Sequence, residues 1–422
     1  MNILIVGGGA REHTIVWKLS RSPRVDKIYT APGNAGTAQI AQNIDIDATD
    51  IQALLKTAIE KKIDLTVVGS EAPLATGIVD EFQARELLIF GPSKAAAHIE
   101  ASKVFAKNLM QKYNIPCAAS VSFSSYTEAK QYLENNAPPF VIKADGLAAG
   151  KGVTVAETTD QALAALADIM LTRVFGFAGD RVLIEEKLEG KEMSVFSFVD
   201  AYTSAPSTPA CDYKPIFEGN KGPNTGGMGS YSPPVFLTPE LLRIANDDIM
   251  QPTIKAMHQE GCPYSGVLYG GLMITAKGPK VIEFNARLGD PETQVVLPRL
   301  KTDLLDIMLA VVNNHLENIN IEWKNEACVG VVMASSGYPG SYKKGLPIGG
   351  LGDLDDDILV FHAGTSLDSA GNIITSGGRV LTVSATADTI AQAREKVYNN
   401  ISRISFEGCY YRRDIALFNT GQ

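Results

Sequence analysis

The chain has 422 residues, of which 45% are hydrophobic and 20% are charged, a composition that predicts a soluble globular protein with several domains. Its 38 basic and 47 acidic residues give a formal net charge of −9, which argues against a nucleic-acid partner because binding to a phosphate backbone needs a basic face. The five cysteines lie far apart in the sequence and include no C-x-x-C pair, so we expect no disulfide framework. No signal peptide or membrane-spanning stretch is apparent, and we expect a cytoplasmic protein.

The first hundred residues alternate short apolar strands with helical patterns. Strands are expected at residues 3–6, 27–30, 65–68 and 88–90, with helices at about 12–20, 51–60 and 76–84. This alternation is typical of a parallel sheet with helices on both faces, the doubly wound α/β arrangement.

Turns follow the first three of these strands, at residues 7–9, 31–36 and 69–74, and the first two are rich in glycine. Ordinary turn chemistry is the alternative interpretation of the second and third turns. The carboxyl ends of parallel strands share one edge of the sheet, where open α/β sheets bind ligands. Glu12 stands where a dinucleotide-binding fingerprint has its third glycine, so the match to that fingerprint is weak. We expect a monophosphate here, held by the N–H groups of the turn.

The segment that follows begins with a helix predicted over about 93–113. A small α+β unit then spans about 120–188 and could move as a lid. Its predicted elements are strands at 140–143, 153–156 and 182–185 and an alanine-rich helix at 159–171.

The glycine-rich run 144–152 joins two strands of this unit. Glycines leave backbone N–H groups free to approach phosphate oxygens, and Lys143 and Lys151 add a compact positive charge at each end. The spacing is not that of a P-loop, because Gly152 stands where Ser or Thr is required. The run predicts a loop that closes over a nucleotide triphosphate.

Carboxylates lie at the end of the strand at 182–185 and just beyond it, at Glu185, Glu186 and Glu192. An apolar slot with backbone groups can bind adenine, and a carboxylate can accept hydrogen bonds from ribose hydroxyls. A solvated charge run is the alternative interpretation of these three residues.

The next part has longer strands from residue 193, a glycine-rich loop at 219–229 and a helix at 239–259, before strands at 266–274 and 280–285. The period of two in a strand points Glu283 and Asn285 to the same face. Oxygen ligands beside a triphosphate favour Mg²⁺, because phosphate and water complete the octahedron. A helix at 304–314 follows, and residues from 328 onward form a small α+β domain with short strands at 329–334, 358–363 and 380–385.

Taken together, five segments resemble the ATP-grasp superfamily and, within it, the glycinamide ribonucleotide synthetases. They are APGNAG (31–36), VIKADGLAAGKGV (141–153), GPNTGGMG (222–229), EFNARLGDPETQ (283–294) and GGRV (377–380). The resemblance covers nearly the whole chain. It implies an ATP-dependent carbon–nitrogen ligase of purine biosynthesis that joins glycine to 5-phosphoribosylamine through glycyl phosphate, using Mg²⁺ or Mn²⁺.

The resemblance also implies roles for individual residues. The expected catalytic residues are Lys143, Arg287, Asp212 and Lys214. ATP is expected at Lys103, Lys143, Gly146, Gly150, Lys151, Gly152, Glu185, Glu186, Leu188 and Glu192, and the metal at Glu283 and Asn285. Substrates are expected at Gly9, Ala10, Arg11, Glu12, Gly33, Asn34, Gly226, Gly227, Met228, Asp290, Pro291 and Glu292.

The chain departs from the family pattern at Ala10, Ser70, Cys211 and Tyr213, while Asp212 and Lys214 keep the charges of their strand. We expect a Rossmann-like domain over 1–102, ATP-grasp domains over 103–192 and 193–326, and an α+β domain over 327–422. The protein is expected to be a monomer or a weak homodimer.

Three alternatives remain at this point. A different ATP-grasp ligase, acting on bicarbonate or formate, would share the nucleotide residues and differ at 7–13 and 222–229. A nicotinamide-dependent oxidoreductase built on the first glycine turn is disfavoured by the missing third glycine. A non-catalytic nucleotide sensor would not need the acidic cluster at 283–292.

Overall fold

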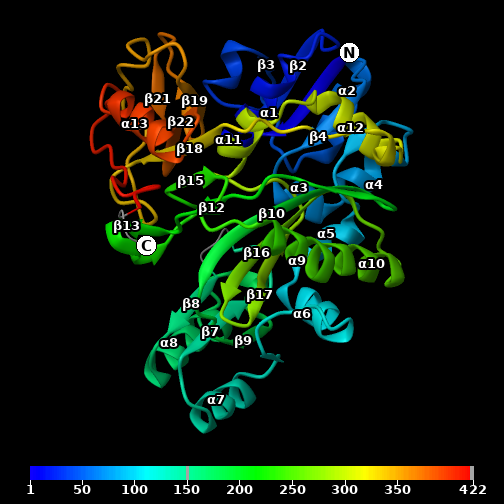
Figure 1. Cartoon of the computed structure of the whole chain (residues 1–422), viewed down its shortest axis with the longest axis vertical. Coiled ribbons are helices and arrows are strands. Elements are labelled where there is room, and N and C mark those ends of the chain that lie inside the picture. The colour runs from blue at the N-terminus through cyan, green and yellow to red at the C-terminus, as the bar shows by residue number, and fades with distance from the viewer. Residues whose placement is uncertain (149–151, 419–422) are drawn as a thin grey trace.

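A computed structural model describes residues 1–148 and 152–418. Four parts can be followed in Figure 1: the N-terminal sheet, the lid, a central antiparallel sheet and a C-terminal sheet. The expected multidomain fold, with a parallel α/β part at the N-terminus and α+β parts after it, is confirmed.

The N-terminal sheet contains β1 (Asn2–Gly7), β2 (Lys27–Pro32), β3 (Gln42–Asn43), β4 (Leu65–Val68) and β5 (Ile89–Phe90). All pairs are parallel, in the order β3-β2-β1-β4-β5. Alternate residues of β1 face opposite cores. Leu4 packs with residues of α2 (Ile51–Glu60), and Ile5 packs with residues of α1 (Ala10–Leu19), so both faces are covered as predicted.

The helix expected at 76–84 is wrong in its extent. The chain forms α3 (Glu71–Thr76) and α4 (Ile78–Gln83), separated by Gly77 at φ +97°. A left-handed residue ends a helix, and glycine adopts that conformation without a Cβ penalty. The new helix start places Glu71 directly after the turn at the sheet edge.

The single helix expected at 93–113 is also wrong. Two helices, α5 (Lys94–Ala101) and α6 (Lys103–Lys112), meet at Ser102, which is extended at φ −134° and ψ 113°. The Ser102 hydroxyl accepts a hydrogen bond from the Phe105 N–H at 3.0 Å and donates one to Asp145 Oδ1 at 2.9 Å. The break therefore ties the start of α6 to the start of the glycine-rich loop.

The lid contains β6 (Ser120–Phe123), β7 (Phe140–Ala144), β8 (Val153–Ala156) and β9 (Val182–Glu186), in the order β6-β9-β7-β8. Helices α7 (Tyr126–Asn135) and α8 (Thr159–Met170) pack on this sheet, and their apolar side chains form a separate small core with it. A core of its own is what a unit needs in order to move as a body.

The central sheet contains β10 (Lys191–Asp200), β11 (Ser204–Pro206), β16 (Ser265–Thr275) and β17 (Gly278–Asn285), in the antiparallel order β11-β10-β16-β17. The helix expected at 239–259 is interrupted, because α9 (Pro239–Ile244) and α10 (Gln251–Gln259) are joined by a π-helical turn over Ala245–Met250. Pro252 has no N–H to donate, which accounts for a local change of hydrogen-bond pattern.

The C-terminal sheet contains β12 (Cys211–Asp212), β15 (Gly229–Ser232), β18 (Ala327–Ala334), β19 (Leu359–His362) and β22 (Arg379–Ala387), in the order β12-β15-β18-β22-β19. Helix α13 (Ile390–Ile401) packs on it. The region expected as a loop at 219–229 is partly a hairpin of β13 (Pro215–Phe217) and β14 (Lys221–Asn224). Short strands β20 (Thr365–Leu367) and β21 (Ile373–Thr375) form a second hairpin. Two other helices lie between the parts. Helix α11 (Thr293–Val296) contacts α1 and strands β15 and β18 of the C-terminal sheet, and α12 (Leu304–Val312) contacts β10 and β16 of the central sheet and β5 of the N-terminal sheet.

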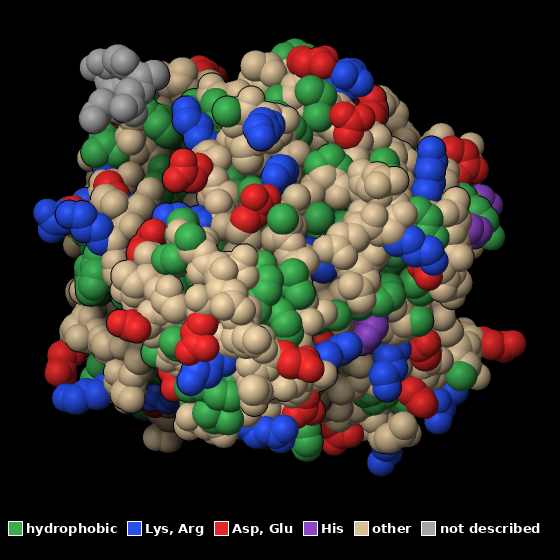
Figure 2. Space-filling view, turned by 90° about the horizontal axis from the view of Figure 1, so that it is seen from below, with side chains coloured by type: hydrophobic (Ala, Val, Ile, Leu, Met, Phe, Trp, Pro, Cys, Tyr) green, Lys and Arg blue, Asp and Glu red, His purple; other side chains and the backbone are tan. Residues whose placement is uncertain are grey.

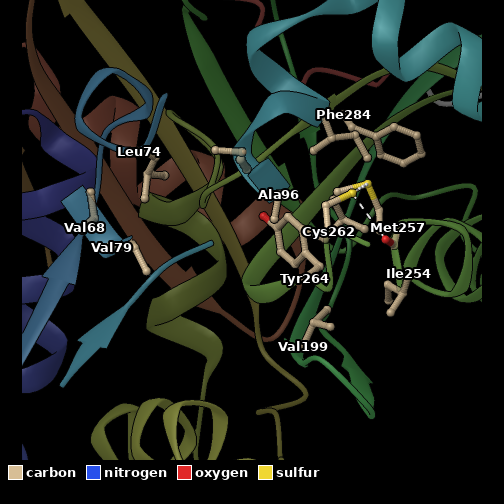
Figure 3. Close-up of a cluster of buried hydrophobic side chains, with 14 of the residues drawn as sticks. Val68, Leu74, Val79, Ala96, Val199, Ile254, Met257, Cys262, Tyr264 and Phe284 are labelled. Carbon is tan, nitrogen blue, oxygen red and sulfur yellow. Dashed lines mark hydrogen bonds between the residues drawn. The ribbon is translucent and has the colours of Figure 1, made fainter. Parts of the chain in front are cut away.

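One buried core joins the N-terminal part to the central sheet. Figure 3 shows Val68, Leu74 and Val79 on one side of this core and Tyr264 and Met257 on the other. The N-terminal part and the central sheet are therefore joined by continuous apolar packing. Figure 2 shows acidic and basic side chains interspersed over the lid end of the molecule. Among the described residues, no helix is long and apolar enough to cross a membrane.

Candidate active site

A cavity of about 500 Å³ lies where the lid, the central sheet and loops of the N- and C-terminal parts meet. Its volume falls in the range of small-molecule sites, roughly 300–1,000 Å³. The predicted site residues that line it are Arg11, Lys103, Lys143, Gly146, Gly152, Glu185, Glu186, Leu188, Glu192, Asp212, Lys214, Gly226, Glu283, Asn285, Arg287, Asp290 and Glu292. Gly150 and Lys151 lie outside the described residues.

Lys143 on β7 and Lys107 on α6 share one buried carboxylate. Glu185 lies 3.0 Å from Lys143 Nζ and 3.2 Å from Lys107 Nζ, and none of the three side chains is more than 4% exposed. Lys143 also donates a hydrogen bond to the Ile282 carbonyl at 3.0 Å. In this structure the Glu185 carboxylate orients two lysines, whereas the sequence suggested a place at the adenine or ribose edge.

Lys103 begins α6 and holds the described start of the glycine-rich loop, because its Nζ donates to the Gly146 carbonyl at 2.9 Å. Asp145 bonds to Ser102 and to Arg181, whose Nη2 is 2.6 Å from Asp145 Oδ2. Burial lowers the pKa of Lys103, although Glu283 opposes the shift. The loop is thereby anchored to α6 at one side and to the end of the lid at the other.

Glu283 and Asn285 lie two residues apart on β17, where they pair with Gly271 and Tyr269 of β16, and both line the cavity. Burial alone would raise the pKa of Glu283. The positive charges of Lys214, Lys143 and Lys103 have the larger combined effect, so the pKa is lowered and the carboxylate is charged. No group of three or more acidic, His or Cys side chains among the described residues could hold a metal ion. Two oxygen donors fit Mg²⁺ or Mn²⁺ when ligand oxygens complete the shell.

A second acidic group surrounds Lys214. Its Nζ lies 2.6 Å from Glu192 Oε2 and 3.1 Å from Asp212 Oδ1. Burial raises the pKa of Asp212 to about 7, with Glu292 and Glu192 adding to the shift and Lys214 opposing it. A carboxyl with that pKa can exchange a proton near neutral pH.

Arg287 follows β17 and is held by two carboxylates that the sequence analysis did not identify. Its Nη2 lies 2.8 Å from Glu100 Oε1, and its Nε lies 3.3 Å from Glu71 Oε2. Burial raises the pKa of Glu71, but Arg287 and Arg11 outweigh it and lower the pKa to about 2. Arg11 also donates from Nε to Glu12 at 2.7 Å, so both arginines are engaged by protein groups.

At the start of α1, where a monophosphate is predicted, one N–H group of the turn is bonded to a side chain of the helix itself. Glu12 Oε2 accepts a hydrogen bond from the Gly9 N–H at 2.7 Å, and a Cβ at Gly7 or Gly69 would stand within 2.6 Å of Glu12. Asn34 is likewise engaged, since it donates to the Gly8 carbonyl at 3.0 Å and to the His362 carbonyl at 2.7 Å. These contacts explain the glycines of the turn without a ligand.

Several predicted substrate residues are not among the residues that line the cavity. They are Gly9, Ala10, Glu12, Gly33, Asn34, Gly227, Met228 and Pro291. The departures at Ala10, Ser70, Cys211 and Tyr213 also lie outside the cavity lining.

Other lining residues were missed, among them Glu71, Glu100, Lys107 and Arg379. Arg379 was quoted only within the GGRV segment. Lys107 lies four positions after Lys103 and therefore on the same face of α6. That spacing is the sequence signal that could have identified it.

Comparison with known proteins gives matches along the chain. Models of phosphoribosylglycinamide synthetase match its N domain at residues 1–100, its ATP-grasp (A) domain at 101–293 and its C domain at 328–417. The chain is 50% identical over 415 residues to the phosphoribosylamine–glycine ligase of Halalkalibacterium halodurans, covering 98% of this chain and 96% of that protein. It is 51% identical to the corresponding ligase of Caldanaerobacter subterraneus, covering 99% of each.

Solved structures agree with these matches. The phosphoribosylamine–glycine ligase of Thermotoga maritima superimposes with a TM-score of 0.86 at 31% identity, covering 98% of this chain and 100% of that one. The biotin carboxylase domain of a Hydrogenobacter thermophilus 2-oxoglutarate carboxylase, solved with MgADP, superimposes with a TM-score of 0.73 at 16% identity, covering 97% of this chain and 91% of that one. At that identity the likeness concerns the fold alone.

Proposed function

The chain belongs to the phosphoribosylglycinamide synthetase family, and from that membership we propose the reaction and the residue roles of its active site. It is an ATP-grasp ligase of purine biosynthesis. The reaction proposed is ATP + glycine + 5-phosphoribosylamine → glycinamide ribonucleotide + ADP + phosphate.

Two steps account for this stoichiometry. The glycine carboxylate attacks the γ-phosphorus of ATP, forming a carbonyl–O–P linkage and releasing ADP. The amine of 5-phosphoribosylamine then attacks the carbonyl carbon, the amide forms, the amine loses a proton and phosphate leaves. Activation is needed because a carboxylate oxygen is a poor leaving group.

The triphosphate belongs at the lysine end of the cavity. Lys143 and Lys103 are oriented there by Glu185 and by the Gly146 carbonyl, and preorganised cations stabilise charge that spreads over a transferred phosphoryl group. Glu283 and Asn285 would hold Mg²⁺ or Mn²⁺, which when bound would neutralise phosphate charge. Adenine is proposed for the apolar end, lined by Met110, Val141, Val155, Leu188 and Met273.

The amine belongs at the acidic group around Lys214. Asp212, whose pKa burial raises above its ordinary value, is proposed to accept the proton that the attacking amine loses. Glu292 is proposed to bind the glycine ammonium group. It is held by Ser194, whose hydroxyl donates to Glu292 Oε1 at 2.9 Å.

Glycyl phosphate hydrolyses in water, so the cavity has to be closed during the reaction. The lid carries both Lys143 and the glycine-rich loop on its own sheet and core. We propose that the lid, residues 120–188, closes over the bound nucleotide and excludes water.

The observation that carries the proposal is the convergence of Lys143, Lys103 and the Glu283–Asn285 pair on one cavity. We expect Lys143→Ala to abolish ADP formation while the circular dichroism spectrum stays unchanged. Lys130→Ala, on the exposed surface of α7, is the matched control and should keep wild-type turnover. Full turnover in Lys143→Ala would remove this lysine from the mechanism.

Substrate identity is tested by phosphate release from ATP with glycine, formate or bicarbonate, each with and without 5-phosphoribosylamine. We expect sustained release only with glycine and the amine together. Release with bicarbonate or formate would instead favour another ATP-grasp ligase.

A further inference from the structure

The sugar substrate carries a phosphate, and the sequence predicted the glycine turn at the start of α1 as a monophosphate site. The turn at the start of α1 already holds the Glu12 carboxylate, which is itself an anion bonded to the Gly9 N–H. Arg11 and Arg287 each use all three guanidinium nitrogens in contacts with protein groups. A further cation must therefore serve the sugar phosphate.

Arg379 reaches the cavity from the C-terminal sheet through a bulge. Met333 pairs with Leu381 and Ala334 pairs with Arg379, so Val380 is the extra residue of β22. Val380 and Leu381 are both in the core of the C-terminal part, while Arg379 lines the cavity. A bulge of this kind changes the direction of a side chain. Here the Arg379 guanidinium points away from the core of the C-terminal part and into the cavity.

The glycines beside Arg379 permit this approach. A Cβ at Gly378 would stand 2.3 Å from the Tyr338 ring, and a Cβ at Gly377 would stand 2.8 Å from Gly364 Cα. On the opposite side, a Cβ at Gly226 would stand 2.9 Å from the Arg379 guanidinium carbon. Close packing on both sides fixes the position of the guanidinium.

The described residues contact the Arg379 guanidinium through one of its nitrogens. Nη1 donates to the Gly226 carbonyl at 2.5 Å and the Asp290 carbonyl at 2.9 Å, and it lies 3.2 Å from Asp290 Oδ1. Within the described part of the chain, Nε and Nη2 have no hydrogen-bond partner, and the side chain is 22% exposed. An arginine held at one nitrogen presents two parallel donors at the other edge, the geometry that suits phosphate.

We propose that Arg379 binds the 5-phosphate of the sugar substrate through Nε and Nη2. This inference rests on the proposed function and adds the C-terminal domain to the substrate site. Asp290 holds the guanidinium in place through Nη1, and Gly226 provides the space that the planar group needs.

The nearby charges distinguish the end of the cavity at Arg379, here called the arginine end, from the nucleotide end. The cations that act on Glu283 are mainly Lys214, Lys143 and Lys103, whereas those that act on Asp290 are Arg379, Arg11 and Arg287. The glycine carboxylate must meet the γ-phosphate at the lysine end in order to react. The anion left for the arginine end is the sugar phosphate.

The test is Arg379→Gln in the full-length enzyme. We expect KM for 5-phosphoribosylamine to rise about 10- to 100-fold, as for loss of a charged hydrogen-bond pair, with KM for ATP and glycine within about twofold of wild type. Ribose 5-phosphate should inhibit the wild type competitively against the amine, ribose should not, and the variant should lose the inhibition by a similar factor.

Arg403→Gln is the matched control, because Arg403 is paired with Asp355 on the C-terminal surface. It should keep all three KM values. Arg379→Lys retains one positive charge but lacks the planar guanidinium, so it should give an intermediate KM for the amine. If the glutamine variant fails to fold, the KM of the lysine variant tests whether Arg379 binds the sugar phosphate.

An unchanged KM for the amine and unchanged inhibition by ribose 5-phosphate would overturn the inference. So would a rise confined to KM for glycine, which would assign Arg379 to a carboxylate. Both results require a wild type that makes glycinamide ribonucleotide, so they leave the proposed function standing. A wild type that makes no product would reject the proposed function itself.

Discussion

A buried carboxylate with two lysine partners is the most informative single residue of the cavity. In the sequence, Glu185 belongs to a group of carboxylates with two possible interpretations. The group either binds adenine and ribose or is a run of solvated surface charges. The pairing of β7 with β9 sets Val141 opposite Glu185, which makes Lys143 a diagonal neighbour on the same face. That register depends on strand pairing across 44 positions and is not visible in a local pattern.

Glu185→Gln should therefore act on stability and on ATP binding together. The substitution keeps the shape but leaves Lys107 and Lys143 without their shared anion, and breaking a buried ion pair costs about 3 kcal/mol. Burial already lowers the pKa of Lys107, and loss of Glu185 should lower it further. Urea unfolding should give a lower free energy of unfolding, and KM for ATP should rise.

Glu134→Gln is the control for this prediction. Glu134 lies on α7 of the same lid, outside the cavity lining, is 50% exposed, and pairs with Lys130 at 3.7 Å. An exposed pair contributes about 0–1 kcal/mol, so both measurements should stay near wild type. Equal effects of the two variants would contradict the anchoring role of Glu185.

At the scale of elements, the alternation of strands and helices was predicted well, and the helix ends were predicted poorly. The parallel order of the first sheet follows from hydrophobic periodicity, which is a local property. The break between α5 and α6 is not local, because Ser102 is held by Asp145 from the lid. A hydroxyl within an otherwise helical pattern gives no sign of a partner 43 positions away.

Ser102→Ala tests what this break does. The variant loses the cap of α6, at a cost of about 1 kcal/mol, and also loses the bond to Asp145 at the start of the glycine-rich loop. We expect a lower free energy of unfolding together with a severalfold rise in KM for ATP, measured by urea unfolding and steady-state kinetics.

Ser125→Ala separates the two effects. Ser125 caps α7 by accepting a hydrogen bond from the Glu128 N–H, the same chemistry at a helix start on the outer side of the lid. It should lower stability by a similar amount and leave KM for ATP unchanged. If both serine variants raise KM for ATP equally, the contact with Asp145 has no role in nucleotide binding.

At the scale of the whole molecule, the sequence identified residues at both ends of the cavity, including Arg11, Arg287 and Asp290 at the arginine end. It missed Arg379 and the two carboxylates, Glu71 and Glu100, that hold Arg287. Lys143, Glu283 and Asn285 lie in segments with a strong local pattern. Glu71, Glu100 and Arg379 come from three separate regions of the chain, and tertiary packing alone brings them to the cavity. The glycines at 7–9 were interpreted as ligand-binding, and packing gives a further reason for their small size. A Cβ at Gly7 or Gly9 would meet the Glu12 side chain, and a Cβ at Gly8 would meet the Gly33 carbonyl.

The N- and C-terminal parts meet at a buried histidine pair, which makes their contact sensitive to acid. His13 on α1 accepts a hydrogen bond at Nδ1 from the His362 N–H at 2.8 Å, and its ring packs edge-on against Phe361 at 5.9 Å. His362 Nδ1 lies 3.1 Å from Thr365 Oγ1. Burial lowers the pKa of His13 to about 3, with His362 adding to the shift, and lowers the pKa of His362 to about 4.

The sign of the pH dependence follows from these shifts. Both histidines stay neutral in the folded protein, whereas the unfolded chain takes up protons below about pH 6.5. Stability should therefore fall as the pH drops from about 6.5 toward 4, by at most about 1.4 kcal/mol per pH unit for each group. Asp212 acts in the opposite sense, because its raised pKa makes the folded protein bind a proton that the unfolded chain releases.

His13→Gln isolates the histidine contribution. Glutamine can still accept the bond from the His362 N–H but does not titrate, so the free energy of unfolding should depend less steeply on pH between about 6.5 and 4.5. Urea unfolding at several pH values in that window measures the slope, and Asp212 contributes equally to both proteins. His258→Gln, on the exposed end of α10, should keep the wild-type slope. A His13→Gln slope equal to that of wild type would mean that the contact between the two parts does not depend on a neutral His13.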